Sequence, residues 1–263
     1  MIDLEKAQIF DEIVERWRKI VVPFFTREPK SQTGVNVFGS GFMAVYKSVY
    51  FLVTAKHVLD DAMRYGTCAI NVNDSVLLLK NIYFFTDPDN DLAFAPIGDV
   101  LSKNKVETIL AINLTKEGKI PESFGYHLLL GYPASKNRLD PRWKKVNRML
   151  YSFTAEANVA KKSLIKTVAD PVVFDYDPKK QIDSFLKPTG QAPHLYGMSG
   201  GPALEVRFSG TDENGYSFYV TLSGVLVEWH QNKRAIVAAS SSSLINALEA
   251  TVSKYIKNPN IGE

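Results

Sequence analysis

The sequence predicts an all-β protein, built as a barrel or a sandwich, with one helix near each end of the chain. From Gly34 onward, short runs rich in Val, Tyr and Phe are broken by Gly, Asn, Asp or Pro, which is typical of strands joined by turns. These runs do not alternate with helical segments, so the pattern does not favour strand–helix–strand units. The expected strands are 42–46, 50–54, 69–72, 75–79, 83–85, 92–95, 126–130, 150–155, 165–168, 172–176, 203–208, 217–222 and 225–229.

Residues 1–23 are expected to form an amphipathic helix. Apolar side chains recur there three or four positions apart, with Glu and Lys between them, and Pro23 is expected to end the helix. Such a helix usually packs on its own domain, and docking on a partner is the alternative. The apolar positions are Leu4, Ala7, Phe10, Val14, Trp17 and Val21.

A second helix is expected over residues 240–258. Ser240 or Ser241 is a suitable N-cap, and four apolar side chains fall on one face after it, namely Leu244, Leu248, Val252 and Ile256. Residues 97–122 carry few strand signals, so we expect this segment to link two β domains.

Composition limits the function classes. The chain has 263 residues and a net charge of +3, far from the basic excess of a nucleic-acid binder. Cys68 is the only cysteine, which favours a reducing cytoplasm, and we expect neither a signal peptide nor a membrane span. The basic stretch 136–148 is interpreted as a solvated loop face, with a groove for an acidic ligand as the alternative.

The segment "LYGMSGGPAL" places Ser199 among three glycines and before a proline. A tight turn between strands is one interpretation; a turn that presents a nucleophile and two backbone N–H groups is the other. The segment also fits G-x-S-x-G, the nucleophile elbow of α/β-hydrolases. That motif needs a strand before it, a helix after it and a downstream histidine, and "QAPHLY", "GGP" and His230 fit these requirements poorly, so we reject it.

Upstream residues offer a base and an acid in the opposite order. His57 follows the apolar run "VYFLVTA", and Asp91 directly precedes "LAFAPI". A serine hydroxyl needs a neighbouring base to become a nucleophile, and imidazole titrates near neutrality. Taken singly, His57 is more often a buried hydrogen-bonded residue, and Asp91 fits a turn residue after Pro88.

The stretches "GSGF", "LVTAKHV", "NDLA", "LGYP" and "GMSGGP" together resemble the chymotrypsin-fold (trypsin-like) serine proteases, most nearly the disulfide-free bacterial HtrA-like protease domain. The resemblance covers residues 33–245. It implies two six-stranded antiparallel β-barrels, one over residues 30–115 with His57 and Asp91, and one over residues 120–245 with Ser199.

The resemblance also implies roles for these residues. Ser199 would be the nucleophile, His57 the general base and then acid, and Asp91 the carboxylate that orients the imidazole. The backbone N–H groups of Gly197 and Ser199 would form the oxyanion hole. Glu228 and Trp229 would lie near bound peptide.

Three features depart from the family. Met198 stands where digestive members carry the aspartate that pairs with a new N-terminus, so we expect no activating cut. Pro193 stands where trypsin-type members place a pocket aspartate, so a preference for basic residues gains no support. After Ser199, 64 residues remain, which we expect to finish the second barrel and a helix without an added PDZ domain.

We therefore expect a cytoplasmic serine endopeptidase that acts on a protein or peptide substrate, without nucleic acid, membrane, metal or cofactor. His127, His194 and His230 belong to no catalytic set and are interpreted as structural, and Cys68 as a buried apolar residue. Two alternatives stay open. One is a latent protease that a protein partner activates or inhibits, and the other is a non-catalytic peptide-binding module on the same fold.

Overall fold

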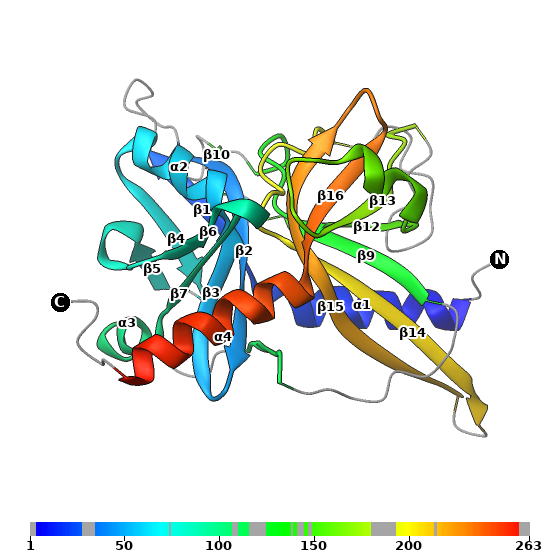
Figure 1. The fold of residues 1–263 in the computed structure, drawn as a ribbon, viewed down its shortest axis with the longest axis horizontal. Coiled ribbons are helices and arrows are strands. Elements are labelled where there is room, and N and C mark those ends of the chain that lie inside the picture. The colour runs from blue at the N-terminus through cyan, green and yellow to red at the C-terminus, as the bar shows by residue number, and fades with distance from the viewer. Residues whose placement is uncertain are drawn as a thin grey trace.

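The computed structural model describes residues 4–27, 35–73, 75–106, 110–115, 125–137, 139–140, 145–146, 149–179, 193–212 and 215–257. Two β-sheets lie side by side (Figure 1), and almost all of their strand pairs are antiparallel. The expected β class is therefore confirmed. The helices are α1 (Leu4–Arg18), α2 (Lys56–Tyr65), α3 (Gly98–Lys103) and α4 (Ser241–Lys257), with short 3₁₀ turns η1 (Leu79–Asn81), η2 (Pro88–Asn90) and η3 (Val159–Leu164).

The first sheet has the order β5-β4-β1-β2-β3-β7-β6, and β8 pairs with β2 in parallel. It therefore has eight strands, where six were expected. The additional strands come from segments interpreted as helix or linker. The strands are β1 (Val21–Arg27), β2 (Val35–Tyr46), β3 (Val49–Ala55), β4 (Cys68–Val72), β5 (Ser75–Leu78), β6 (Phe85–Asp87), β7 (Leu92–Pro96) and β8 (Ile112–Asn113).

The N-terminal helix is shorter than the expected 1–23. It ends at Arg18, and Val21 already pairs with Phe42 in the first sheet, so this sheet begins before residue 30. Pro23 lies within β1 instead of ending a helix. It pairs with β2 only, because β4 joins β1 from Phe24 onward, and a proline without an N–H is tolerated where one side of the strand is unpaired.

The second sheet has six strands, the number that was expected, in the order β12-β9-β14-β15-β16-β13. The expected strands 217–222 and 225–229 form one strand, and residues 235–240 form a strand that was not expected. A bridge between Ala157 and Phe174 links the residues just after β12 with β13, the two ends of that order. The expected strand at 165–168 is absent; the η3 turn ends at Leu164, and a bend follows over residues 167–170. The strands are β9 (Gly125–Gly131), β12 (Tyr151–Ala155), β13 (Pro171–Asp175), β14 (Pro202–Asp212), β15 (Gly215–His230) and β16 (Ala235–Ser240), and β10 (Leu139–Asp140) pairs separately with β11 (Lys145–Val146).

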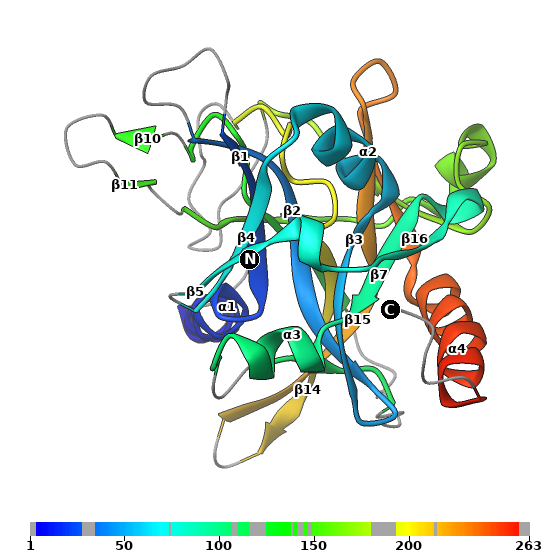
Figure 2. The ribbon, with the colours of Figure 1, turned by 90° about the vertical axis from the view of Figure 1, so that its left-hand side faces the viewer.

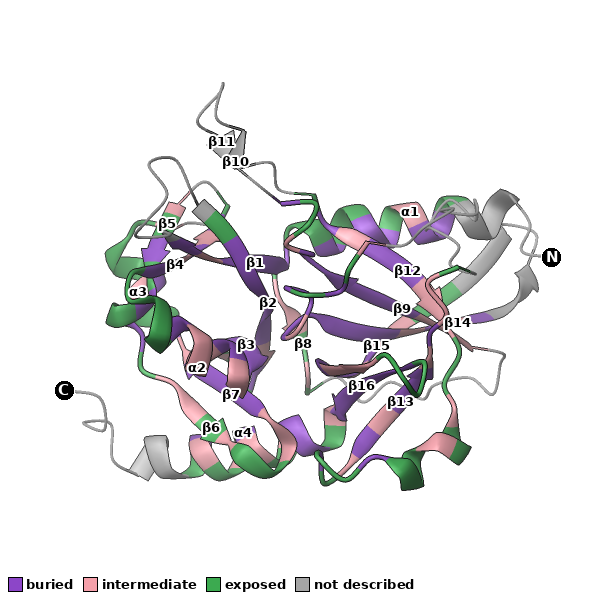
Figure 3. Cartoon of the chain, turned by 90° about the horizontal axis from the view of Figure 1, so that it is seen from above, coloured by how far each residue is buried: buried purple, intermediate pink, exposed green. Residues whose placement is uncertain are grey.

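The helices at the two ends of the chain lie on opposite sides of the molecule (Figures 2 and 3). Phe10 of α1 is fully buried and packs edge-on against Tyr126 and Phe208 of the second sheet, although the next strand, β1, belongs to the first. The expected packing of this helix on its own chain is confirmed. α4 follows β16 of the second sheet, and Glu249 on it binds Tyr46 at the end of β2 and Lys47 in the turn after it.

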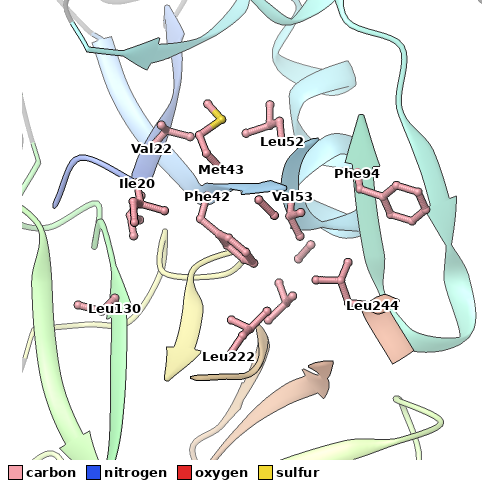
Figure 4. Packing of buried hydrophobic residues seen from close by; sticks show 14 of the residues in the cluster. Ile20, Val22, Phe42, Met43, Leu52, Val53, Phe94, Leu130, Leu222 and Leu244 are labelled. Carbon is pink, nitrogen blue, oxygen red and sulfur yellow. The ribbon is translucent and has the colours of Figure 1, made fainter. Parts of the chain in front are cut away.

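The two sheets share a hydrophobic core. Phe42 and Val53 of the first sheet face Leu222 of the second and Leu244 of α4 (Figure 4), and all four side chains are buried. Figure 3 shows buried residues concentrated on the strands and exposed ones on the outer faces of the helices. Burying large apolar side chains from both sheets together fixes how the sheets sit, and therefore fixes the position of any site between them.

Candidate active site

His57 and Asp91 meet because of strand pairing. Ala55, the last residue of β3, pairs with Leu92, the first residue of β7. The residue just before Leu92 therefore lies beside the residues that follow Ala55. His57 is the second residue of α2, so the helix begins where the strand ends. Asp91 closes the η2 turn with a left-handed backbone at φ 52°, a conformation that Asp tolerates better than most residues.

Asp91 makes two hydrogen bonds to His57 and one to the residue before it. One carboxylate oxygen, Oδ2, lies 2.6 Å from the imidazole Nδ1, and the other, Oδ1, accepts the backbone N–H of His57 at 2.9 Å. The carbonyl oxygen of Asp91 accepts the N–H of Lys56 at 2.8 Å. With Nδ1 bound to the carboxylate, Nε2 is left to exchange a proton with another group.

The pKa of His57 lies above its ordinary value. Burial lowers it, but the hydrogen bond and the charge of Asp91 raise it more, and the charges of Asp61 and Glu228 add to the rise. The imidazole side chain is 40% exposed and the Asp91 side chain 19% exposed, so His57 is open to solvent on one side while its partner is largely shielded. Glu228 belongs to β15 of the second sheet, so one of the charges that act on His57 comes from that sheet.

Glu228→Gln is expected to lower the pKa of His57. The substitution keeps the size of the side chain and removes one of the negative charges that stabilise the imidazolium. A titration of the His57 ring protons by NMR measures the change. Glu205→Gln is the matched control, because the charge of Glu205 acts on His127. A His57 titration that moves equally in both variants, or in neither, would contradict this assignment.

Hydrogen bonds fix the turn around Ser199 on all sides. Ser40 binds two carbonyl oxygens of the turn: its Oγ donates to Gly197 O at 2.7 Å, and its N–H donates to Ser199 O at 2.8 Å. The other two carbonyl oxygens accept backbone N–H groups, Tyr196 O from Ala134 N at 2.8 Å and Met198 O from Gly201 N at 3.0 Å. Three N–H groups of the turn also have acceptors: Met198 N binds Leu195 O, Gly200 N binds Leu226 O, and Gly201 N binds Met198 O. Such a turn has little freedom to change shape.

The N–H groups of Gly197 and Ser199 differ from their neighbours. Among the residues that the structure describes, neither has a hydrogen-bond acceptor, whereas the N–H groups of Met198 and Gly200 both do. The carbonyl before Gly197 is bound to Ala134 N, which turns the N–H of the same peptide in the opposite direction. Two unpaired N–H donors beside a hydroxyl can bind an oxygen that gains negative charge.

Glycine is required at the back of this turn. Gly200 has φ +86°, and a Cβ there would lie 2.0 Å from the carbonyl oxygen of Ser40 and 2.3 Å from Oγ1 of Thr54. A Cβ on Gly201 would lie 2.0 Å from the carbonyl oxygen of Leu130. The turn therefore sits directly against β2 and β3 of the first sheet and β9 of the second, as close as backbones approach.

The Ser199 turn lies against the end of the strand that leads to His57, because a Cβ on Gly200 would lie 3.0 Å from the backbone nitrogen of Ala55. Among the described residues, no hydrogen bond joins Ser199 to His57. The hydroxyl of Ser199 lies 3.4 Å from the carbonyl oxygen of Val227. Ser199 and the expected residues Glu228 and Trp229 line one cavity, and the charge of Glu228 also acts on His57. The structure thus pairs His57 with Asp91 directly and gathers Ser199, Glu228 and Trp229 around one cavity.

The remaining histidines and Cys68 have structural contacts. His127 packs against Phe174, at 5.1 Å between ring centroids, and burial lowers its pKa. His194 accepts the N–H of Tyr196 at 3.3 Å, and His230 Nε2 lies 2.7 Å from Glu228 Oε2, so both lie at the edge of the site. Cys68 is buried, as expected. Most of the basic stretch 136–148 lies outside the described residues.

Sequence reasoning missed one residue that the site depends on. Ser40 is fully buried; besides its two bonds to the Ser199 turn, its Oγ accepts Tyr132 N at 2.8 Å and its carbonyl oxygen accepts Thr54 Oγ1 at 2.7 Å. It connects the first sheet to the turn and to the "LGYP" segment. The stretch "GSGF" held the signal, because a serine between two glycines at a strand bend allows close approach of another backbone.

No protein-family model matches this chain, and no curated protein matches its sequence. Among solved structures, the chain is similar to one described as "Aromatic interactions drive the coupled folding and binding of the intrinsically disordered Sesbania mosaic virus VPg protein". The two share 15% sequence identity at a TM-score of 0.46, over 88% of this chain and 90% of that chain. A likeness at this level carries no argument about function, so the site has to be interpreted from its own geometry.

The described residues contain neither a cluster of metal-binding side chains nor a candidate membrane-spanning helix. They hold no group of three or more His, Cys, Asp or Glu side chains placed to bind a metal ion. No helix among them combines the length and apolar character that a bilayer span requires.

Proposed function

We propose that the chain is a serine endopeptidase that cleaves peptide bonds through an acyl-enzyme on Ser199. The observation that carries the proposal is the turn 196–201, where the N–H groups of Met198, Gly200 and Gly201 have acceptors and those of Gly197 and Ser199 have none among the described residues. Buried backbone N–H groups are normally paired, so two unpaired donors on either side of Met198 and beside a hydroxyl favour a binding role. The Asp91–His57 pair supplies the base that such a hydroxyl needs.

The proposed chemistry follows the roles that these groups are suited to. His57 Nε2 takes the proton of the Ser199 hydroxyl as its oxygen attacks the peptide carbonyl, and Asp91 stabilises the imidazolium that forms. The carbonyl oxygen becomes an oxyanion held by the N–H groups of Gly197 and Ser199. His57 then gives its proton to the departing amine, and water, activated by the same imidazole, releases the acyl group from Ser199.

The fold we propose is the chymotrypsin-like arrangement of two β-barrels with the site between them. The six-strand order of the second sheet supports it, together with the bridge between Ala157 and Phe174 at its two ends. The position of the Ser199 turn, which contacts both sheets through Ser40 and Leu226, is also as this arrangement requires. Cys68, as the only cysteine, supports a reducing cytoplasm as the compartment.

We further propose that the oxyanion site forms without an activating cut. Met198 stands where an ion-paired aspartate would be needed, and it is buried among apolar side chains. Ser40 fixes the shape of the turn instead, because its Oγ donates to Gly197 O and its N–H donates to Ser199 O.

Ser40→Ala is expected to lower kcat by about 10–100-fold with little change in KM. It leaves the buried carbonyl of Gly197 and the buried N–H of Tyr132 without a partner, which costs roughly 1–3 kcal/mol per group and favours other shapes of the turn. Steady-state kinetics and denaturant unfolding measure the two effects. Ser152→Ala, another buried serine, is the control. Equal losses of kcat in both variants would show that Ser40 acts only on stability.

A latent protease is the second candidate, and one observation favours it. The Ser199 hydroxyl is directed to Val227 O and has no hydrogen bond to His57 within the described residues. In this candidate a partner or a substrate turns the hydroxyl toward the imidazole.

Labelling with a fluorophosphonate tests the proposal. The uncut chain is incubated with the probe alone and with a cell extract, and the modified residue is located by mass spectrometry. Modification of Ser199 in the chain alone, lost in Ser199→Ala and in His57→Ala, supports the active protease. Modification only in the presence of extract supports the latent form. No modification under either condition refutes the proposal and leaves a peptide-binding module.

A further inference from the structure

A small cavity lies directly beside Ser199. Its volume is about 30 Å³, and besides Ser199 its walls include Leu195, Met198, Leu226, Trp229 and Ile236. Leu195, Met198, Leu226 and Ile236 are buried apolar side chains. In the proposed reaction, the carbonyl carbon under attack must reach the Ser199 oxygen. The side chain of that substrate residue is then two bonds away, and this cavity is the space next to it.

Aromatic rings limit how far the cavity can widen. The Trp229 ring packs edge-on against His194 at 5.0 Å between centroids, and against Tyr176 at 5.9 Å. Tyr176 is itself buried and packs against Phe153 at 5.3 Å. Trp229 is therefore held between a ring at the rim of the cavity and a buried aromatic cluster behind it. It cannot turn away without breaking contacts on one side.

The cavity also offers no free charge for a long basic side chain. Among the described residues, Glu228 is the one acidic residue in its wall, and its Oε2 is already bound by Thr167 Oγ1 at 2.6 Å and by His230 Nε2 at 2.7 Å. A lysine or arginine side chain would have to displace these partners and also pass the ring of Trp229. The wall that remains is apolar.

We propose that this cavity selects substrates with a small aliphatic residue, alanine in the first place, on the acyl side of the cleaved bond. This inference rests on the proposed function. A cavity of about 30 Å³ has room for one or two groups the size of a water molecule, which a methyl group approaches. A phenyl or guanidinium group is larger than this space, so we expect it to enter only when Trp229 moves.

The test uses fluorogenic peptides that differ only in the residue before the cleaved bond, with Ala, Phe or Arg at that place. The full-length chain is expected to show a kcat/KM at least about 10-fold higher for Ala than for Phe or Arg, since mismatches in apolar pockets change rates by roughly 10–200-fold. Trp229→Ala removes the wall and is expected to reverse the order of Ala and Phe. Equal values for the three peptides in the wild-type chain, or a preference for Phe or Arg, would overturn the inference.

Two further variants keep the result clear. His194→Ala removes the outer ring against Trp229 from an exposed position, so it serves if Trp229→Ala does not fold, and it is expected to raise kcat/KM for Phe relative to Ala. Tyr219→Ala removes an exposed aromatic ring from the same strand, outside the cavity, and is expected to leave the preference unchanged. Labelling of Ser199 by a fluorophosphonate with no peptide part is run in parallel. If Ser199 reacts while the preference is absent, only this inference fails; if Ser199 never reacts, the proposed function fails.

Discussion

Asp91→Asn is expected to lower kcat about 10⁴-fold while the fold stays intact. The asparagine oxygen can still accept the backbone N–H of His57, the bond that measures 2.9 Å with the carboxylate. Its amide N–H groups, however, face Nδ1, where the carboxylate oxygen lies at 2.6 Å. An amide donates to Nδ1 and so keeps the imidazole proton on Nε2, where the ring cannot accept the proton of Ser199.

Asp89→Asn is the matched control for this substitution. Asp89 lies in the same turn and is exposed, and its carbonyl oxygen, which accepts Ala169 N, is unchanged in the variant. Turnover of a peptide substrate and the midpoint of denaturant unfolding are measured for both. The expected result is a large loss of turnover in Asp91→Asn alone, with similar unfolding midpoints. If Asp91→Asn turned over like the wild type, Asp91 would be a turn residue and not part of a catalytic unit.

Gly200→Ala is expected to lower the free energy of unfolding by about 3–5 kcal/mol and to abolish labelling of Ser199. Its φ of +86° is strained for alanine, and the new Cβ would lie 2.0 Å from the carbonyl oxygen of Ser40. The turn would have to move away from the first sheet. This movement breaks the bonds from Ser40 that hold the carbonyl groups of Gly197 and Ser199.

Gly66→Ala separates the clash from the backbone strain. Gly66 has nearly the same φ, +85°, but a Cβ there meets nothing within 4 Å. We expect it to cost about 1–3 kcal/mol, since its backbone lies in a sparsely populated region at φ 85° and ψ −89°, and to leave labelling unchanged. Denaturant unfolding and the labelling rate are measured for both variants. Equal destabilisation by the two substitutions would mean that the turn does not press against the first sheet as described.

The β-rich fold and the terminal helices could be predicted from the sequence because Val, Tyr and Phe runs separated by turn residues are a local pattern. The boundaries of the elements and the shortest strand could not be predicted from the sequence. Val21 fits the helical spacing of the residues before it, and only its pairing with Phe42 in the first sheet makes it part of a strand. Ile112 and Asn113 of β8 are too short a run to be recognised, and they become a strand because β2 is there to pair with them.

The candidate site could be predicted to a similar extent. His57, Asp91 and Ser199 carry local motifs, so the sequence alone is enough to select them together. Ser40 could not be assigned a role, because its partners Gly197 and Tyr132 lie 157 and 92 residues away in the chain. The ring of Trp229 against His194 also depends on tertiary packing, so the size of the cavity beside Ser199 could not be predicted from either residue alone.

The rate at which a fluorophosphonate modifies Ser199, measured across pH, tests most directly whether residues 57, 91 and 199 act as one unit. A base with a raised pKa is protonated up to a higher pH than an ordinary histidine, so the rate should fall as the pH drops through the His57 pKa. We predict a rate profile whose apparent pKa equals that of the His57 ring measured by NMR, and a loss of about 10²–10⁴-fold in His57→Ala. A labelling rate that does not change as His57 titrates would contradict the account, and so would modification spread evenly over other serines.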